Sequence, residues 1–524
     1  MATEPGATEA APQAARRSSS RSMLAVNALV LASLGASFAS HVAIAAFFGL
    51  SRQVDAYYAA LVLPNLFVLL CIDYIGKNFL PIFASARRDG FARASELTSS
   101  IVTIVAILAA LVALVLVIAG RPLLRALLPG FSAGDVEIAS RYLSIMAPTV
   151  VLTAVTSFHQ YVCQHDEDYT AITAIKMAVP LASFAAILTA GPFVGAYALP
   201  IGFTLGHLVT AVLMARRARY DYSPRIGFRE EWERKIFTNS AIVMGSGFVA
   251  RTRGLVATYL SSQLGSGAVA ALALGQRLVD PIHRTAFIGI KMMMFTRVAR
   301  LHAESDTGEI ARLYSRGLSA SFLVLAPLLW WMALDAEAIV RVVFERGAFD
   351  AGMTALVVLA LIGFAPSVVF VGMNTLLSNA FYAMGRVLVP AIVMPVGTVV
   401  YLLVAPAVYR PLGVLGLALS ASLVAVVVFA LLLHRLARRV PALRASGVLR
   451  RLSIHAALSG AAATAAQAVP RTGAGEAVDA VLALVLGSAL YFGVLMLLRD
   501  RTLADVRVYL SRAFPSRAPA ARRR

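Results

Sequence analysis

The stretch IVTIVAILAALVALVLVIAG, residues 101–120, decides the fold class, because it holds twenty consecutive residues without one charged side chain. A helix of about 20 apolar residues is long enough to cross roughly 30 Å of hydrocarbon. Runs of this kind recur along the whole chain of 524 residues, which is 59% hydrophobic and only 14% charged. Because soluble globular domains are about 25% charged, this composition indicates a membrane protein.

Apolar runs of similar length predict an all-α polytopic membrane protein with about 14 transmembrane helices. The first run starts at Met23 and is too long for the apolar core of a signal peptide, so we expect an uncleaved helix. An even number of spans places both termini on one side of the membrane. The predicted spans are 23–49, 55–83, 98–119, 138–162, 169–191, 193–215, 236–260, 266–295, 313–334, 352–380, 386–408, 412–434, 452–469 and 477–498.

The loops between these spans fall into two groups of very different charge. One group, together with the terminal segments, holds roughly 32 Lys and Arg residues, and the alternate loops hold roughly 8. Because Lys and Arg collect in cytoplasmic loops, both termini are predicted to be cytoplasmic. The formal net charge of +20 is therefore mostly a topology signal, and we predict no nucleic-acid partner.

The longest polar interruption is a basic segment, 216–235, which separates six spans from eight. Transporters are often built from two bundles around a site at the membrane midplane, so we predict two lobes around a central cavity. The predicted divisions are a disordered cytoplasmic tail at 1–22, an N-terminal lobe with helices 1–6 at 23–215, the basic cytoplasmic linker at 216–235, helices 7–12 at 236–434, a basic cytoplasmic loop at 435–451, helices 13–14 at 452–498 and a basic tail at 499–524.

Charged residues inside the apolar runs are the strongest functional markers, because ionisable groups in a membrane are costly and usually face an aqueous cavity. In the predicted span 266–295, Arg277, Arg284 and Lys291 recur every seven residues and so share one helix face. Asp280 lies one turn after Arg277. For any single charge, the alternative is a local ion pair or a side chain that reaches the membrane surface.

Further cations lie in other spans and would extend this face into a site. Arg251 and Arg253 belong to the predicted span 236–260, and Lys77 belongs to the span 55–83. A water-filled cavity lined by these residues suits an anionic head group such as a diphosphate, which Arg and Lys hold by charge-assisted hydrogen bonds. The predicted substrate-binding residues are Arg277, Arg284, Arg251, Arg253, Lys77 and Lys291.

The sequence contains few features that would indicate catalysis or cofactor binding. His41, His159 and His207 lie in different spans without the spacing of metal ligands, and the two cysteines suit packing. No phosphate-binding loop, nucleophile elbow or Gly-rich dinucleotide motif occurs in a suitable context. We predict a protein that is not an enzyme and has no cofactor, and the sequence leaves a metal site open.

Several segments, in order along the chain, resemble signatures of the MurJ/MviN family of the multidrug, oligosaccharidyl-lipid and polysaccharide exporter superfamily. FFGLSRQVDAYYAALVLPNLF at 47–67 resembles the family's DAF and PNLL pattern, and ALLPGF at 126–131 resembles its LLAPGF loop. GQRLVDPIHRTAFIGI at 275–290 is similar to its DRL segment, VVFERGAFDA at 342–351 to its LFERGAF motif, and NAFYAMGRVLVP at 379–390 to its FYAxxDTRTPV motif. The chain is identified as a member of this family.

The resemblance implies fourteen helices in two lobes and alternating access through a central cationic cavity. It implies transport of lipid II, the undecaprenyl-diphosphate-linked peptidoglycan precursor, from the inner to the outer leaflet of the bacterial cytoplasmic membrane. Arg277 matches the functional Arg of the DRL segment, although Gln276 replaces the Asp before it, and Asp55 matches the functional Asp of the DAF signature. We assign Asp55 and Asp280 to gating between the lobes.

The sequence departs from the family where the first two helices should carry charges. Ser40 and His41 stand where the family has Arg and Asp, and Val68 and Leu69 stand where it has an arginine pair. Losing buried arginines removes part of the field that binds a diphosphate, unless Lys77 and other cations replace them. Two alternatives stay open. One is a flippase for another polyprenyl-linked saccharide, such as a capsule, exopolysaccharide or O-antigen unit, and the other is a non-transporting scaffold that recruits cell-envelope synthesis proteins.

Overall fold

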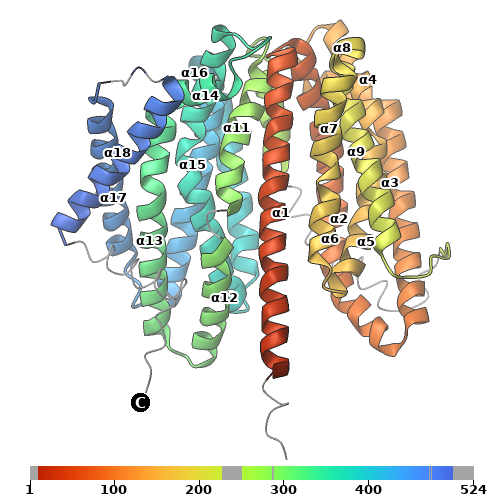
Figure 1. Ribbon diagram of the computed structural model, residues 1–524, viewed down its shortest axis with the longest axis horizontal. Helices are drawn as coiled ribbons and strands as arrows, with labels where there is room; N and C mark the ends of the chain where they lie inside the picture. Colours follow the sequence, from red (N-terminus) through yellow and green to blue (C-terminus); the bar gives the residue numbers. More distant parts are fainter. Residues whose placement is uncertain are drawn as a thin grey trace, which may run out of the picture. The chain divides into compact units, whose positions relative to one another are not determined.

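The computed structural model describes residues 10–226, 249, 251–285, 288–470, 473 and 475–499. Within these ranges every regular element is a helix, which confirms the predicted all-α class (Figure 1). Nine helical segments in the described ranges are long and apolar enough to cross a membrane. The predicted total of about 14 spans is consistent with this set.

Residue contacts divide the chain into two compact units. Unit 1 comprises Met1–Ala270 and Arg346–Asp350, and unit 2 comprises Ala271–Glu345 and Ala351–Arg524. The short segment Arg346–Asp350 is therefore grouped with unit 1, although the residues on both sides of it in the sequence belong to unit 2.

Unit 1 is a helical bundle whose breaks follow proline and glycine. Helix α4 passes into α5 at Ala147, directly before Pro148, which has no N–H to donate. Helix α8 ends at Gly195, whose φ of +59° suits glycine. The elements are α1 (Ala10–Phe48), α2 (Arg52–Asp89), α3 (Phe91–Leu127), α4 (Ala133–Met146), α5 (Pro148–His165), α6 (Tyr169–Lys176), α7 (Ala178–Thr189), α8 (Gly191–Val194), the short 3-10 helix η1 (Gly195–Tyr197), α9 (Ala198–Arg217) and a helical run at 251–262.

Helices α7 and α9 approach each other closely because small residues line their contact. Gly202 and Gly206 lie four residues apart on α9 and both face α7. A Cβ atom at Gly206 would lie 2.6 Å from the Cα atom of Val179, and one at Gly202 would lie 2.6 Å from the Cβ atom of Ala186. Membrane helices pack through such spaced small residues, since apolar burial alone contributes little inside a bilayer.

The first part of the predicted linker 216–235 lies in an extended conformation against α3. The Ser95 hydroxyl accepts a hydrogen bond from the N–H of Asp221 at 3.1 Å. The Ser99 hydroxyl accepts from the N–H of Ser223 at 3.1 Å and donates to the carbonyl of Asp221 at 3.2 Å. These side chains satisfy backbone groups that a loop would otherwise leave to water, so the linker starts as a segment fixed to unit 1. Its boundaries remain a prediction.

Unit 2 contains a helix that doubles back on itself. The predicted spans 386–408 and 412–434 form one helical run, α16, with a break at Gly413, where φ is +58°. A Cβ atom at Gly397 would lie 2.7 Å from a methyl group of Val428, so the two halves lie side by side. The helices are α11 (Ala268–Thr285), α12 (Ile288–Ala303), α13 (Thr307–Leu334), α14 (Ala336–Phe344), α15 (Ala351–Ala383), α16 (Leu388–Arg439), α17 (Ala445–Gln467) and α18 (Glu476–Leu497).

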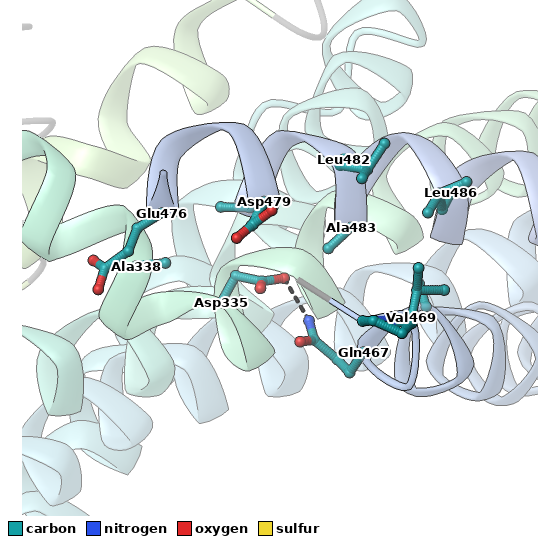
Figure 2. A pocket seen from close by; sticks show the side chains of 12 residues that line it. Asp335, Ala338, Gln467, Val469, Glu476, Asp479, Leu482, Ala483 and Leu486 are labelled. Atoms are coloured by element: carbon teal, nitrogen blue, oxygen red, sulfur yellow. Dashed lines mark hydrogen bonds between the residues drawn. The ribbon is translucent and has the colours of Figure 1, made fainter. Parts of the chain in front are cut away.

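The α17–α18 pair is held to α13 and α14 by polar contacts around a cavity of about 80 Å³ (Figure 2). The Gln467 amide donates to the Asp335 carboxylate at 2.8 Å, and Arg341 donates to Glu476. The hydrogen bond to Glu476 raises the pKa of Arg341 above its ordinary value, because it stabilises the charged guanidinium. Asp479 also lines the cavity. These contacts fix the last helix pair to the body of unit 2.

We expect Gly206→Val to destabilise unit 1, since its Cβ atom would meet the backbone of α7. Overpacking of this kind costs about 1–3 kcal/mol, which outweighs the few tenths of a kcal/mol that Val gains over Gly as a helix former. The matched control is Gly35→Val on α1, where nothing lies within 4 Å of the added Cβ atom. Thermal unfolding of both variants in detergent measures the effect. Equal unfolding temperatures would contradict the close contact of α7 and α9.

Candidate functional site

One end of unit 1 brings together three segments that the sequence singled out. We call it the Phe48 end, because α1 finishes there at Phe48. It comprises the end of α1, the first turn of α2, the 126–131 loop, the segments 262–270 and 346–350. All of these belong to unit 1.

Asp55 lies at the centre of the Phe48 end, and its side chain is fully buried. Helix α2 starts at Ser51, whose hydroxyl accepts from the N–H of Val54 at 3.4 Å, and this places Asp55 in the first helical turn. The two Asp55 carboxylate oxygens accept hydrogen bonds from the N–H groups of Gly267 at 2.6 Å and Ala270 at 2.8 Å. Asp55 therefore caps the start of α11 from another helix, where free N–H groups and the helix dipole favour an anion.

The 126–131 loop contributes Phe131 and Gly130 to contacts at the Phe48 end. The guanidinium of Arg52 lies 5.1 Å from the centre of the Phe131 ring, and its Nη1 atom lies 3.9 Å from the Asp55 carboxylate. The backbone at Gly130 touches the end of the helical run 251–262, because an added Cβ atom would lie 2.0 Å from the carbonyl oxygen of Ser262. Only glycine fits this contact.

The segment Arg346–Asp350 carries the Gly-Ala-Phe part of the VFERGAF motif and contacts the end of α1. The N–H of Ala348 donates to the carbonyl of Ala46 at 2.7 Å. Gly347 has a φ of +63°, and an added Cβ atom would lie 2.3 Å from the same carbonyl oxygen. Phe349 is buried, with 2% of its surface exposed. This segment is therefore attached to unit 1 by its backbone and by an aromatic side chain.

The Glu of the same motif contacts residues of unit 2. Glu345 lies 3.4 Å from the Nε atom of Arg341 on α14, and its carboxylate accepts from the Thr354 hydroxyl on α15 at 2.7 Å. These contacts fix the geometry at the exit of α14, directly before the chain enters unit 1 at Arg346. The motif therefore contacts unit 2 through Glu345 and unit 1 through the backbone of Ala348.

Arg277 and Asp280 lie on α11, and the structure pairs them. The Nη1 atom of Arg277 lies 3.8 Å from the Asp280 carboxylate, and 35% and 25% of the two side chains are exposed. This is the local ion pair that the sequence left as an alternative. A substrate that binds Arg277 would compete with this pair, which at partial exposure contributes about 1 kcal/mol or less.

The other predicted cations are described only in part. Arg251 is exposed, and Arg253 is half-buried and has an interaction partner; both belong to unit 1. The side chains of Lys77 on α2, Arg284 on α11 and Lys291 on α12 lie outside the described residues. A common cavity for these cations stays a prediction.

Ser40 and His41 occupy the positions of α1 where the family resemblance implies Arg and Asp, and both form hydrogen bonds with neighbouring helices. The Nδ1 atom of His41 lies 3.1 Å from the hydroxyl of Tyr58 on α2. The Ser40 hydroxyl is nearly buried and donates to the carbonyl of Pro180 on α7 at 3.2 Å. These two residues hold α1 against its neighbours and supply no fixed charge to a substrate.

The other two histidines considered as metal ligands, His159 and His207, form hydrogen bonds in the core, as the sequence interpretation favoured. The Nε2 atom of His159 lies 2.8 Å from the hydroxyl of Tyr220, and the Nδ1 atom of His207 lies 3.2 Å from the hydroxyl of Thr153. Among the described residues, no group of three or more His, Cys, Asp or Glu side chains could hold a metal ion.

Three contributors to the Phe48 end were not among the predicted site residues: Arg52, Phe131 and Ala348. Each lies inside a motif that marked the family resemblance, so position within a motif was the available signal. Their partners are distant in the sequence, and no spacing rule predicts such contacts.

Known proteins match most of the chain. The sequence model of the family described as "Lipid II flippase MurJ" matches residues 44–475. A lipid II flippase MurJ of Burkholderia cenocepacia is 25% identical over 416 residues, which are 76% of this chain and 80% of the relative. A probable lipid II flippase MurJ of Bdellovibrio bacteriovorus is 25% identical over 421 residues, which are 76% of this chain and 78% of the relative.

Solved structures share the fold. The structure titled "Lipid II flippase MurJ, inward closed conformation" has a TM-score of 0.74 at 14% identity and covers 90% of this chain and 99% of its own. An inward-facing multidrug resistance transporter of the MATE family in the MOP superfamily has a TM-score of 0.58 at 15% identity and covers 77% of this chain and 94% of its own. Because the family model spans far more than half of the sequence, the chain belongs to the lipid II flippase MurJ family.

Proposed function

We propose that this protein moves lipid II from the inner to the outer leaflet of the bacterial cytoplasmic membrane by alternating access. Its family is one of lipid II flippases, which implies a polyprenyl-linked substrate. The family and the apolar helices together indicate a multi-pass protein of the bacterial inner membrane. The observation that carries the proposal is the Phe48 end, where three motifs of the family resemblance meet around the buried carboxylate of Asp55. Such a closure is what one side of an alternating-access transporter needs.

The proposed orientation places both termini in the cytoplasm and the Phe48 end on the periplasmic side. The basic residues at the opposite end of the same helices support it. Arg87 and Arg88 lie in the last turn of α2, and Arg216 and Arg217 lie in the last turn of α9. Because arginines collect on the cytoplasmic side, the head group of lipid II would enter from the end opposite Phe48.

Helix α11 would connect the gate to the substrate. Its first residues are held by Asp55, and Arg277 lies two turns further along the same helix. A diphosphate bound at Arg277 would act on α11 as a rigid helix. The start of this helix must separate from Asp55 when the periplasmic side opens. Two sites that bias one helix in this way are thermodynamically coupled. When the diphosphate binds Arg277, it would take the place of Asp280 in the ion pair.

The proposed binding group is the cation set from the sequence, with the prenyl tail left in lipid. Arginine and lysine side chains hold phosphate oxygens by charge-assisted hydrogen bonds, and no covalent step is required. The protein would therefore act without enzymatic chemistry and without a cofactor. The set comprises Arg277, Arg284, Arg251, Arg253, Lys77 and Lys291.

A second candidate is transport of another polyprenyl-linked saccharide. The observation that favours it is the neutral contact of Ser40 and His41 with α7 and α2, in place of the charged residues of the family. A site with fewer fixed cations on α1 would hold a diphosphate by other residues or accept a less charged head group.

Replacing Arg277 by Gln should reduce the exposure of lipid II on the outer leaflet about tenfold or more, because a hydrogen bond to a charged group contributes about 1.5–3 kcal/mol. The measurement is periplasmic accessibility of lipid II in host cells depleted of the wild-type protein and supplied with the variant. The control is Arg300→Gln, an exposed arginine that lies 3.7 Å from Glu304 on its own helix. Full exposure with Arg277→Gln would favour another cargo or the scaffold.

Replacing Asp55 by Asn should loosen the Phe48 end, because a neutral amide cannot give both N–H groups of α11 a charged acceptor. The reporter is Ser262→Cys, placed in a chain whose Cys71 and Cys163 are replaced by Ala, since Ser262 is buried beside Gly130. A membrane-impermeant maleimide should label this cysteine several-fold faster in Asp55→Asn cells.

The control for this experiment is Asp135→Asn. Asp135 forms the capping box of α4 with Ser132, directly after the 126–131 loop, and it is half-buried. It tests whether loss of any helix cap at this end has the same effect. Equal labelling rates in the two variants would separate Asp55 from the closure and contradict its gating role.

A further inference from the structure

The turn between α16 and α17 exposes arginines that have no acidic partner among the residues that the structure describes. We call residues 435–450 the arginine elbow. The sequence contains no Asp or Glu between residues 351 and 475, so neither helix offers a carboxylate. No side chain of the elbow's exposed arginines forms a hydrogen bond or ion pair within the described part of the chain; they are Arg435, Arg438, Arg439, Arg444 and Arg450.

Basic residues at the end of α12 and the start of α13 are different, because they are paired with carboxylates. Arg297 and Arg312 both bind the carboxylate of Glu309, at 2.9 and 2.7 Å, and Arg300 lies 3.7 Å from Glu304. Topology alone explains an arginine at a cytoplasmic helix end, and it explains these pairs equally well. It does not explain why one turn gathers its cations and excludes every acidic residue.

The elbow has a fixed backbone and lies beside exposed apolar side chains. Val440 and Leu443 are buried, and the N–H of Leu443 donates to the carbonyl of Val440 at 2.8 Å. Leu449 and Ile454 on α17 expose 45% and 44% of their surfaces. Since α16 is a candidate membrane span that ends at Arg439, its last arginines lie where a span meets the aqueous boundary. The elbow therefore has exposed arginines next to exposed apolar side chains.

We propose that the arginine elbow binds the head group of an anionic phospholipid of the inner leaflet. Its guanidinium groups would hold the phosphate in the plane of the head groups, and the exposed Leu449 and Ile454 would contact the acyl chains. The proposal adds a lipid-binding surface outside the transport route, and it uses the proposed orientation only to name the leaflet. Bound lipid would neutralise charges that the described part of the chain leaves without an acidic partner.

The test is native mass spectrometry of the full-length protein in detergent, titrated with phosphatidylglycerol or with phosphatidylcholine of the same acyl chains. Each arginine near an anionic surface contributes about 1 kcal/mol, which is about fivefold in affinity. We therefore expect Arg438→Gln/Arg439→Gln/Arg444→Gln to bind phosphatidylglycerol about tenfold to a hundredfold more weakly than wild type. The substituted side chains are exposed and unpaired in the described structure, so the fold should be retained, and the single variant Arg439→Gln should show an intermediate loss.

The matched control is Arg300→Gln/Arg312→Gln, which removes two exposed, paired cations from the same unit. It should bind phosphatidylglycerol as wild type does. The proposal is overturned if the triple variant keeps wild-type affinity, if the control loses as much, or if wild type binds both lipids equally. Displacement of the lipid by excess inorganic phosphate would assign the elbow to free phosphate instead.

Discussion

A fully buried carboxylate at the Phe48 end is the constraint on which the arrangement of unit 1 depends. An ionisable group away from water is tolerated only where strong donors meet it, and Asp55 has the N–H groups of Gly267 and Ala270. The start of α11 must therefore lie beside the first turn of α2. The close contact of Gly130 with Ser262 adds a second requirement at the same place, because it leaves no room for a side chain.

The VFERGAF motif extends this constraint to the rest of the chain. Its Glu345 is fixed by Arg341 and Thr354 in unit 2, while Ala348 binds the carbonyl of Ala46 and Phe349 is buried in the part grouped with unit 1. The motif therefore makes polar contacts in unit 2 at Glu345 and a backbone contact in unit 1 at Ala348, three residues later. This explains why one short motif needs a carboxylate, a glycine with positive φ and a large aromatic residue in sequence.

Sequence reasoning predicted the membrane helices well because their signal is local. Hydropathy gives the apolar runs directly, and even the two halves of α16 were placed as separate spans on either side of Gly413. It did not predict α14, which is too short to span, or the attachment of the linker to Ser95 and Ser99, of which Ser99 lies inside the predicted span 98–119. The family motif gave Asp55, but its backbone partners lie more than 200 residues away, where no periodicity connects them.

The charges of α11 suggest how a site that lacks the family's arginines on α1 could still hold a dianion. Arg277 has Asp280 at 3.8 Å, but the residue before it is the exposed Gln276, where the family has Asp. One competing carboxylate therefore remains where the family pattern would supply two. A diphosphate carries more charge than a single carboxylate and accepts bidentate hydrogen bonds, so it can displace Asp280 from Arg277 at a modest energetic cost. If Arg277 binds the substrate as proposed, the loss of Asp at position 276 would partly offset the loss of the family's Arg at position 40, because Arg277 then has fewer carboxylates to compete with the diphosphate.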